Sequence, residues 1–232
     1  MTRVGLITGM RVEEACLDDA LAYLPEDRLP LMFCAGASAD RAYRGALTLI
    51  ESGATALLSI GIAGGLDAAL RPGSIVLPDI VIGSGGIQRR VSAKWHATVL
   101  QEVPRPAIGT LFAGTGPACT VAEKAALRAA SGALAVDMES GAVAVAAEEA
   151  NIPFLVLRII ADPADRAIPR AALHGIAPDG SQRPLPVLGR LLLRPADLPA
   201  LIGLARDSKA ALRQLRRVAA LVGPALFAPP TL

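Results

Sequence analysis

The chain has 232 residues, 53% of them hydrophobic and only 3% aromatic, and its net charge is +2. This length fits one large domain that buries its core without disulfides or a structural metal. So small a net charge excludes the basic field that nucleic-acid binding requires, and three cysteines without a Cys-x-x-Cys pair indicate a reducing compartment.

The N-terminal region lacks the features of a secretion signal. A short apolar run follows Arg3 and soon meets Glu13 and Glu14, which makes it too short and too acidic for one. No run of about 18 apolar residues occurs, so no membrane-spanning helix is predicted. We therefore expect a cytoplasmic protein whose apolar surplus covers an oligomer interface or a hydrophobic substrate groove.

Short apolar runs alternate with longer alanine-rich segments over the first two thirds of the chain. The predicted strands are Val4–Thr8, Leu31–Cys34, Ala56–Ile60, Ser74–Leu77, Ile80–Ile82, Ile108–Ala113, Leu134–Asp137 and Phe154–Ile160. The predicted helices are Val12–Tyr23, Ala39–Ser52, Thr120–Ala130, which a capping box starts, and Glu139–Ala150. Most strands lack polar alternation, which is typical of strands covered on both faces. The alternation predicts parallel βαβ units and an α/β fold.

The character of the chain changes after residue 162. Residues 163–186 are rich in Pro, Gly and Arg and predict a loop with at most a short helix. Helices are predicted at Val187–Leu193 and at Ala196–Val222, and the second has an apolar side and a basic side. We expect a catalytic core at residues 1–165, with the loop and helices of residues 166–232 packed on the same domain.

Acidic residues follow three of the predicted strands. Ligands of open α/β sheets bind beyond the carboxyl ends of the strands, where the chain places Glu13, Glu139 and Asp162. Each alone is consistent with a helix cap or a surface acid. Three together repel one another and need a reason to converge, so we expect them around one ligand-sized hollow.

A glycine-rich segment, Gly61-Ile62-Ala63-Gly64-Gly65, follows the predicted strand Ala56–Ile60. It matches neither a dinucleotide fingerprint nor a phosphate-binding loop. Its glycines are consistent with backbone N–H groups turned toward a phosphate or a ribose, or simply with a tight turn. No nucleophile motif occurs, and His96 and His174 are expected in loops or on the surface.

Four motifs occur in order within residues 1–165. They are Gly9-Met10-x-x-Glu13, Gly61-Ile62-Ala63-Gly64-Gly65-Leu66, Val136-Asp137-Met138-Glu139-Ser140-Gly141-Ala142-Val143-Ala144 and Leu157-Arg158-Ile159-Ile160-Ala161-Asp162-Pro163-Ala164-Asp165. Together they resemble the purine nucleoside phosphorylase / methylthioadenosine nucleosidase superfamily. The resemblance implies a three-layer α/β/α fold with a mostly parallel, partly mixed central sheet and a C-terminal helical extension.

The resemblance also implies catalytic roles. Asp162 matches the acid that protonates or hydrogen-bonds N7 of the purine, and Glu13 matches the glutamate that positions an attacking water. An acid at N7 stabilises the departing base, and carboxylates favour the oxocarbenium-like sugar. No cofactor or metal is implied.

Substrate-binding roles follow in the same way. Glu139 matches the glutamate that holds the ribose hydroxyls, and its place at a helix N-terminus predicts that it stays ionised. Met138 matches the residue packed against the sugar. Backbone groups near Cys119 are expected to read the base, and the glycine-rich segment supplies the remaining contacts, at Gly61, Ile62, Ala63 and Gly64.

The chain departs from this pattern in the base pocket. Nucleosidases usually carry Ser where Ala161 and Ile62 stand, so the means of holding Asp162 stays open. The aromatic residue that stacks on the purine is missing from Gly114–Cys119. We therefore expect a remodelled base pocket.

The C-terminal motifs narrow the resemblance to the hopanoid-associated phosphorylase branch. They are His174–Gly180, Leu191–Pro195 and Leu198–Asp207. Members of that branch are assigned the release of adenine from adenosylhopane, which implies an adenosyl substrate with a hydrophobic tail. The terminal helices either shield such a tail or pack on the core or a partner subunit. The basic helix face leaves peripheral membrane contact open, and a homodimer fits the apolar surplus.

The acceptor of the sugar is water or inorganic phosphate. Phosphate requires several cationic or N–H donors at one place. Arg11, Arg41, Arg44 and Arg158 are candidates outside any phosphate motif, and Arg158 is expected to pair with a buried carboxylate instead. Because Glu13 repels a phosphate dianion, hydrolysis is favoured.

Two further readings remain open. A methylthioadenosine/adenosylhomocysteine nucleosidase or a general purine nucleoside phosphorylase would turn over small, water-soluble nucleosides. A non-enzymatic lipid- or nucleotide-binding module would be indifferent to the change Asp162→Asn.

Overall fold

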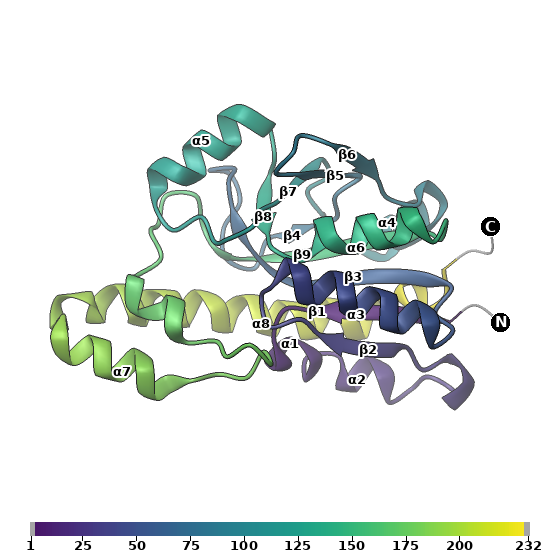
Figure 1. The fold of residues 1–232 in the computed structure, drawn as a ribbon, viewed down its shortest axis with the longest axis horizontal. Helices are drawn as coiled ribbons and strands as arrows, with labels where there is room; N and C mark the ends of the chain where they lie inside the picture. The colour runs from purple at the N-terminus through teal and green to yellow at the C-terminus, as the bar shows by residue number, and fades with distance from the viewer. Residues whose placement is uncertain (1–2, 230–232) are drawn as a thin grey trace.

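A mixed, mostly parallel sheet of nine strands forms the centre of the protein in a computed structural model that describes residues 3–229 (Figure 1). The strands are β1 (Val4–Thr8), β2 (Leu31–Cys34), β3 (Ala56–Gly65), β4 (Ile75–Val76), β5 (Ile80–Gly83), β6 (Gln88–Arg90), β7 (Thr110–Ala113), β8 (Ala135–Asp137) and β9 (Phe154–Asp162). Their order is β2-β1-β3-β8-β7-β5-β6, with β9 paired to β3 and β4.

The long strand β3 joins the two halves of this sheet. Its first part pairs in parallel with β1 and β9, and its last residues, Gly64 and Gly65, pair antiparallel with β8. The carboxyl ends of β1, β3, β8 and β9 are thereby brought toward one region, where an open α/β sheet binds its ligand.

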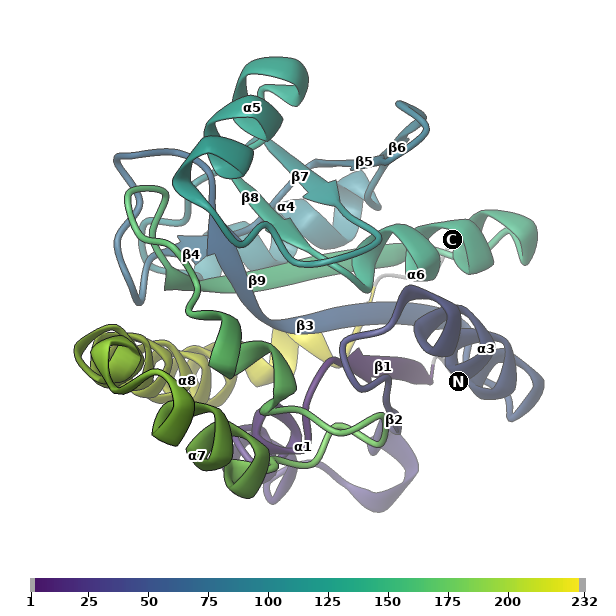
Figure 2. The same cartoon turned by 60° about the vertical axis from the view of Figure 1, so that its left-hand side comes forward.

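Helices cover both faces of the sheet, which confirms the predicted three-layer architecture (Figures 1 and 2). They are α1 (Arg11–Glu14), α2 (Asp18–Leu21), α3 (Ala39–Glu51), α4 (Ala93–Glu102), α5 (Val121–Ser131), α6 (Ser140–Glu149), α7 (Pro184–Leu193) and α8 (Leu198–Leu226), with 3-10 turns η1 (Glu26–Arg28), η2 (Arg170–His174) and η3 (Pro195–Asp197). Helix α8 packs on β9 and β3, whereas α3 and α6 lie on the opposite face.

The C-terminal helix α8 is part of the core. Ala211, Leu215 and Val218 lie fully buried on its inner side, and the Trp95 indole of α4 donates a 3.0 Å hydrogen bond to the carbonyl of Ala225. Helix α7 and the beginning of α8 extend beyond the sheet (Figure 1). Within residues 3–229 no helix is both long and apolar enough to span a bilayer.

The helix predicted over Val12–Tyr23 is wrong. The chain forms the two short helices α1 and α2, because the amides of Cys16 and Leu17 bond to carbonyls three residues back, at Glu13 and Glu14. These tighter bonds end α1 after one turn.

Helix α4 was not predicted, and the loop or surface position expected for His96 is also wrong. Ser92 caps α4 by accepting a hydrogen bond from the Trp95 amide. Trp95, His96 and Val99 are buried, and His96 Nε2 lies 3.1 Å from the carbonyl oxygen of Leu77. A helix of ten residues with one buried stripe carries too short a pattern to stand out in the sequence.

Candidate active site

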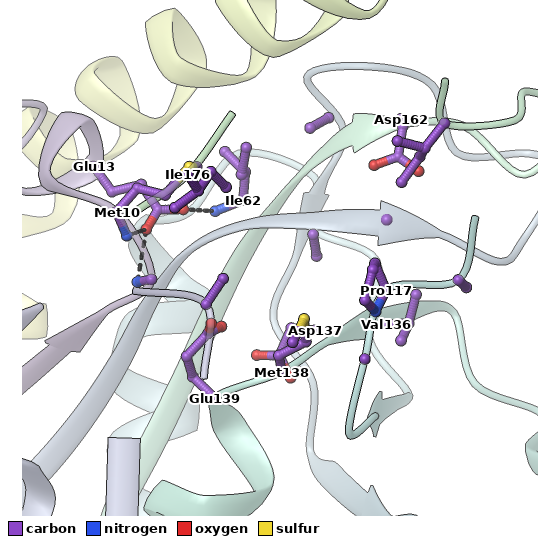
Figure 3. A pocket seen from close by; sticks show the side chains of 18 residues that line it. Met10, Glu13, Ile62, Pro117, Val136, Asp137, Met138, Glu139, Asp162 and Ile176 are labelled. Atoms are coloured by element: carbon purple, nitrogen blue, oxygen red, sulfur yellow. Dashed lines mark hydrogen bonds between the residues drawn. The ribbon is translucent and has the colours of Figure 1, made fainter. Parts of the chain in front are cut away.

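Glu13, Glu139 and Asp162 line one cavity of about 170 Å³ at the carboxyl ends of the strands (Figure 3). The expected convergence of these acids is therefore confirmed as geometry. The wall is formed by Gly9, Met10, Glu13, Ala37, Ile62, Ala63, Gly64, Gly116, Pro117, Ala118, Val136, Asp137, Met138, Glu139, Ala161, Asp162, Ile168 and Ile176.

Three backbone amides hold the carboxylate of Glu13. Its Oε2 accepts from the amides of Gly9 and Met10, each at 2.8 Å, and its Oε1 accepts from the amide of Ile62 at 2.7 Å. Burial raises the pKa of Glu13, and these hydrogen bonds oppose that rise. The carboxylate is thus fixed in orientation, with lone pairs left for one more donor.

The glycine-rich segment is the end of strand β3, so its interpretation as a tight turn is wrong. Gly64 pairs with Asp162 across β3 and β9, which continues both strands past their predicted ends. Gly61 does not line the cavity; a Cβ there would lie 2.5 Å from Oε1 of Glu13. Glycine at this position makes room for the glutamate, while Ile62, Ala63 and Gly64 face the cavity as predicted.

Arg158 is buried, and its positive charge lies next to the carboxyl groups of Asp137 and Glu139. Its guanidinium bonds to Asp137, with Nε 2.7 Å from Oδ2, and lies 3.5 Å from Oε2 of Glu139. The predicted pairing of Arg158 with a buried carboxylate is therefore confirmed. Because the guanidinium is bonded to Asp137 and does not line the cavity, it is not free to bind a phosphate there.

Glu139 stands at the start of α6, and Met138 beside it also lines the cavity. Burial acts against the ionised form of Glu139 that the helix N-terminus was predicted to favour. Burial and the neighbouring Asp137 raise the pKa of Glu139 to about 8, and Arg158 only partly offsets them. Near neutral pH the protonated carboxyl both donates and accepts a hydrogen bond, which suits a pair of ribose hydroxyls.

Asp162 closes the other side of the cavity and pairs with Lys124, which no sequence motif had singled out. Lys124 of α5 is fully buried, and its Nζ lies 2.5 Å from Oδ2 of Asp162. Burial raises the pKa of Asp162, and Lys124 opposes the rise. Little in the sequence indicates this role for Lys124. It is a single lysine within the predicted helix, directly after Glu123 of the capping box.

The prediction that backbone groups near Cys119 read the base stays a prediction, but it does not fall on Cys119 itself. Cys119 does not line the cavity, and both of its backbone polar groups are engaged. Its amide donates to Oε2 of Glu123 at 2.8 Å, and its carbonyl accepts from the Ile168 amide at 2.8 Å. The capping box of α5 causes this, since Glu123 turns back to the amides that precede the helix. Pro117 and Ala118 reach the cavity instead.

No lysine or arginine lies among the cavity residues of the described chain. Arg11 faces Glu14 and Asp179 at about the limit of an ion pair, and Arg44 pairs with Asp40 at 2.7 Å. Arg41 lies over the ring of Phe33, 5.8 Å from its centroid. Within residues 3–229 no group of three or more His, Cys, Asp or Glu residues is arranged to hold a metal ion.

Glu13 and Asp162 lie on opposite sides of the cavity, with Met138 and Glu139 between them (Figure 3). Glu13 contacts β3 at Gly61, and Asp162 contacts it at Gly64. Three residues along a strand span about 10 Å. The arrangement offers one carboxyl group to each end of a ligand, and a third to its middle.

Comparisons with known proteins agree with this geometry. The model of the phosphorylase superfamily matches residues 30–192. A search of curated protein sequences found no match.

Solved structures share the fold. One is a 5'-methylthioadenosine/S-adenosylhomocysteine nucleosidase from Neisseria meningitidis in complex with methylthio-immucillin-A, with a TM-score of 0.71 and 17% identity over 97% of this chain and 100% of that one. Another is the futalosine hydrolase of Helicobacter pylori, with a TM-score of 0.68 and 15% identity over 94% of this chain and 97% of that one. At this identity the likeness concerns the fold.

Proposed function

The chain belongs to the phosphorylase superfamily, and from that premise we propose that it is an enzyme that hydrolyses the N-glycosidic bond of a purine nucleoside. The placement of Glu13 and Asp162 on opposite sides of one cavity carries this proposal. It gives the attacking water and the departing base a separate carboxyl group each.

In this reaction the base lies at the Asp162 side and the sugar near Met138 and Glu139. The bond between C1′ of the sugar and N9 of the purine breaks, and its electron pair leaves with the base. Asp162 donates a proton to N7, which neutralises the charge that develops on the purine. Glu13 orients a water molecule toward C1′ and accepts its proton as the new C1′–O bond forms, and until then the Glu13 carboxylate stabilises the positive charge that builds on the sugar.

Water is the acceptor because the cavity has no cation for phosphate. Its wall carries neither lysine nor arginine, so it lacks the cationic donors that a phosphate dianion requires, and the Glu13 carboxylate would repel such an ion. The test is adenine release from methylthioadenosine by purified protein, with and without inorganic phosphate. We expect equal rates and free methylthioribose; strict dependence on phosphate, with a sugar phosphate as product, would refute hydrolysis.

For the substrate we propose an adenosyl compound with a hydrophobic group on the ribose, with adenosylhopane as the specific candidate. Ile168 and Ile176 form an apolar part of the wall. Helix α7 packs next to this part of the wall. Its Val187 side chain would lie 3.3 Å from a Cβ added at Gly175, the residue before Ile176. Adenine release from adenosylhopane should exceed release from methylthioadenosine; the reverse order would favour the methylthioadenosine/adenosylhomocysteine nucleosidase alternative.

We propose that the enzyme is cytoplasmic. We also propose that it contacts the membrane surface through α7. The solvent side of α7 is apolar: Leu185, Leu188 and Leu193 are 78%, 54% and 82% exposed. Residues 166–206 carry six arginines against two aspartates, although the net charge of the whole chain is only +2. An exposed apolar helix face with arginines around it suits an anionic lipid surface. The homodimer stays a prediction that light scattering checks.

A further inference from the structure

Lys124 is the only fully buried lysine among the described residues, and its ammonium group has three acceptors. Nζ lies 2.5 Å from Oδ2 of Asp162, 2.8 Å from the carbonyl oxygen of Pro163 and 2.9 Å from that of Arg166. A lysine ammonium has three protons, so each proton has a partner. A buried cation persists only with such pairing.

We propose that Lys124 is the positioning residue for Asp162. It occupies Oδ2 and leaves Oδ1 to face the base in the cavity. It also ties down the segment after β9, which reaches the cavity wall again at Ile168. The capping box at Thr120 and Glu123 fixes the start of α5 and hence the place of Lys124. Ala161 has no hydroxyl to hold the acid, and this lysine does so instead.

This role rests on the proposed function, in which Asp162 donates a proton to the base. The charge of Lys124 opposes the effect of burial on the Asp162 carboxyl. Without the cation, the pKa of Asp162 rises further, because the largest opposition to desolvation is then lost. Lys124 therefore affects both where the acid points and the pH range over which it holds its proton.

The experiment is a double-mutant cycle of Lys124→Met and Asp162→Asn, followed by adenine release from methylthioadenosine. In the wild-type background Lys124→Met should lower kcat by about a hundredfold, as expected for a displaced catalytic group, with little change in KM. In the Asp162→Asn background the same change should cost no more than about twofold. The exposed Lys94→Met is the matched control and should behave like the wild type.

A pH profile separates positioning from a merely structural role. The basic limb of kcat/KM should move to higher pH in Lys124→Met, because the acid keeps its proton longer. Equal losses in both backgrounds, or an unmoved basic limb, would overturn the proposal. If Lys124→Met does not fold, the comparison of Asp162→Asn with the double variant Asp162→Asn/Lys124→Met still tests the proposal. A large further loss of kcat in the double variant would contradict it. Full activity of Asp162→Asn would refute the proposed function instead.

Discussion

At the scale of single residues, the acids of the cavity differ in how they are held. Three amides hold Glu13, Arg158 holds Asp137 and Lys124 holds Asp162, whereas the contact of Glu139 with Arg158 is a longer one of 3.5 Å. Burial and the neighbouring Asp137 raise the pKa of Glu139 to about 8. This acid should link folding to pH.

The sign of that linkage follows from the proton each state holds. Above the ordinary pKa of 4.5 the unfolded chain has lost the Glu139 proton, whereas the folded chain keeps it up to about 8. The free energy of unfolding contributed by this group therefore falls as pH rises through that interval. Glu139→Gln cannot titrate, so its urea midpoint should fall less over the same interval. The exposed Glu102→Gln is the control, and identical slopes for Glu139→Gln and the wild type would contradict the assignment.

At the scale of elements, the end of β3 sets the geometry of the site. Its parallel pairing with β9 brings Gly64 to Asp162, and its amide at Ile62 fixes Glu13. Gly61 lies against the Glu13 carboxylate with no room for a side chain. The strand thus acts as a template that spaces the two carboxyl groups.

Gly61→Ala should displace Glu13 and lower kcat for adenine release by roughly a hundredfold. The new Cβ would lie 2.5 Å from Oε1 and 2.7 Å from Cδ, and three amides prevent the carboxylate from moving freely. Gly83→Ala, at the end of β5, is the matched control because nothing lies within 4 Å of its added Cβ. A wild-type rate for folded Gly61→Ala would mean that the position of Glu13 is unimportant.

At the scale of the whole molecule, the C-terminal hairpin of α7 and α8 differs from the rest of the surface. One end of it is anchored in the core through α8, and the other extends past the sheet (Figures 1 and 2). The exposed leucines of α7 lie in this second part. Among residues 3–229 the ion pairs include none of Arg183, Arg190 or Arg194 of this hairpin. Arg183 and Arg194 flank helix α7, and Arg190 lies within it between Leu188 and Leu193.

The protein should sediment with vesicles of phosphatidylcholine and phosphatidylglycerol, and less with phosphatidylcholine alone. Each arginine near an anionic surface contributes about 1 kcal/mol, so replacing Arg183, Arg190 and Arg194 by Gln should weaken binding by about a hundredfold. Changing Leu185, Leu188 and Leu193 together to Gln should abolish vesicle binding, while Ile87→Gln on the β5–β6 hairpin should leave it unchanged. A dimer that the leucine variant converts to a monomer, without vesicle binding, would assign this face to a second copy of the chain.

The sequence by itself determined the layered α/β architecture and the three acids, because strand pattern and strand ends are local features. Val4–Thr8 and Leu31–Cys34 are strands at their predicted bounds. The family resemblance assigned Glu13, Glu139 and Asp162, and all three meet at one cavity.

Only the tertiary structure decided how those acids are held and charged. Lys124 reaches Asp162 across 38 positions of sequence, and β3 reaches Glu13 across 49. The pKa of Glu139 depends on burial and on Asp137, which no local pattern encodes. Contacts between distant segments and the loss of water around a carboxyl arise only when the sheet and its helices assemble, so no single stretch of sequence contains them.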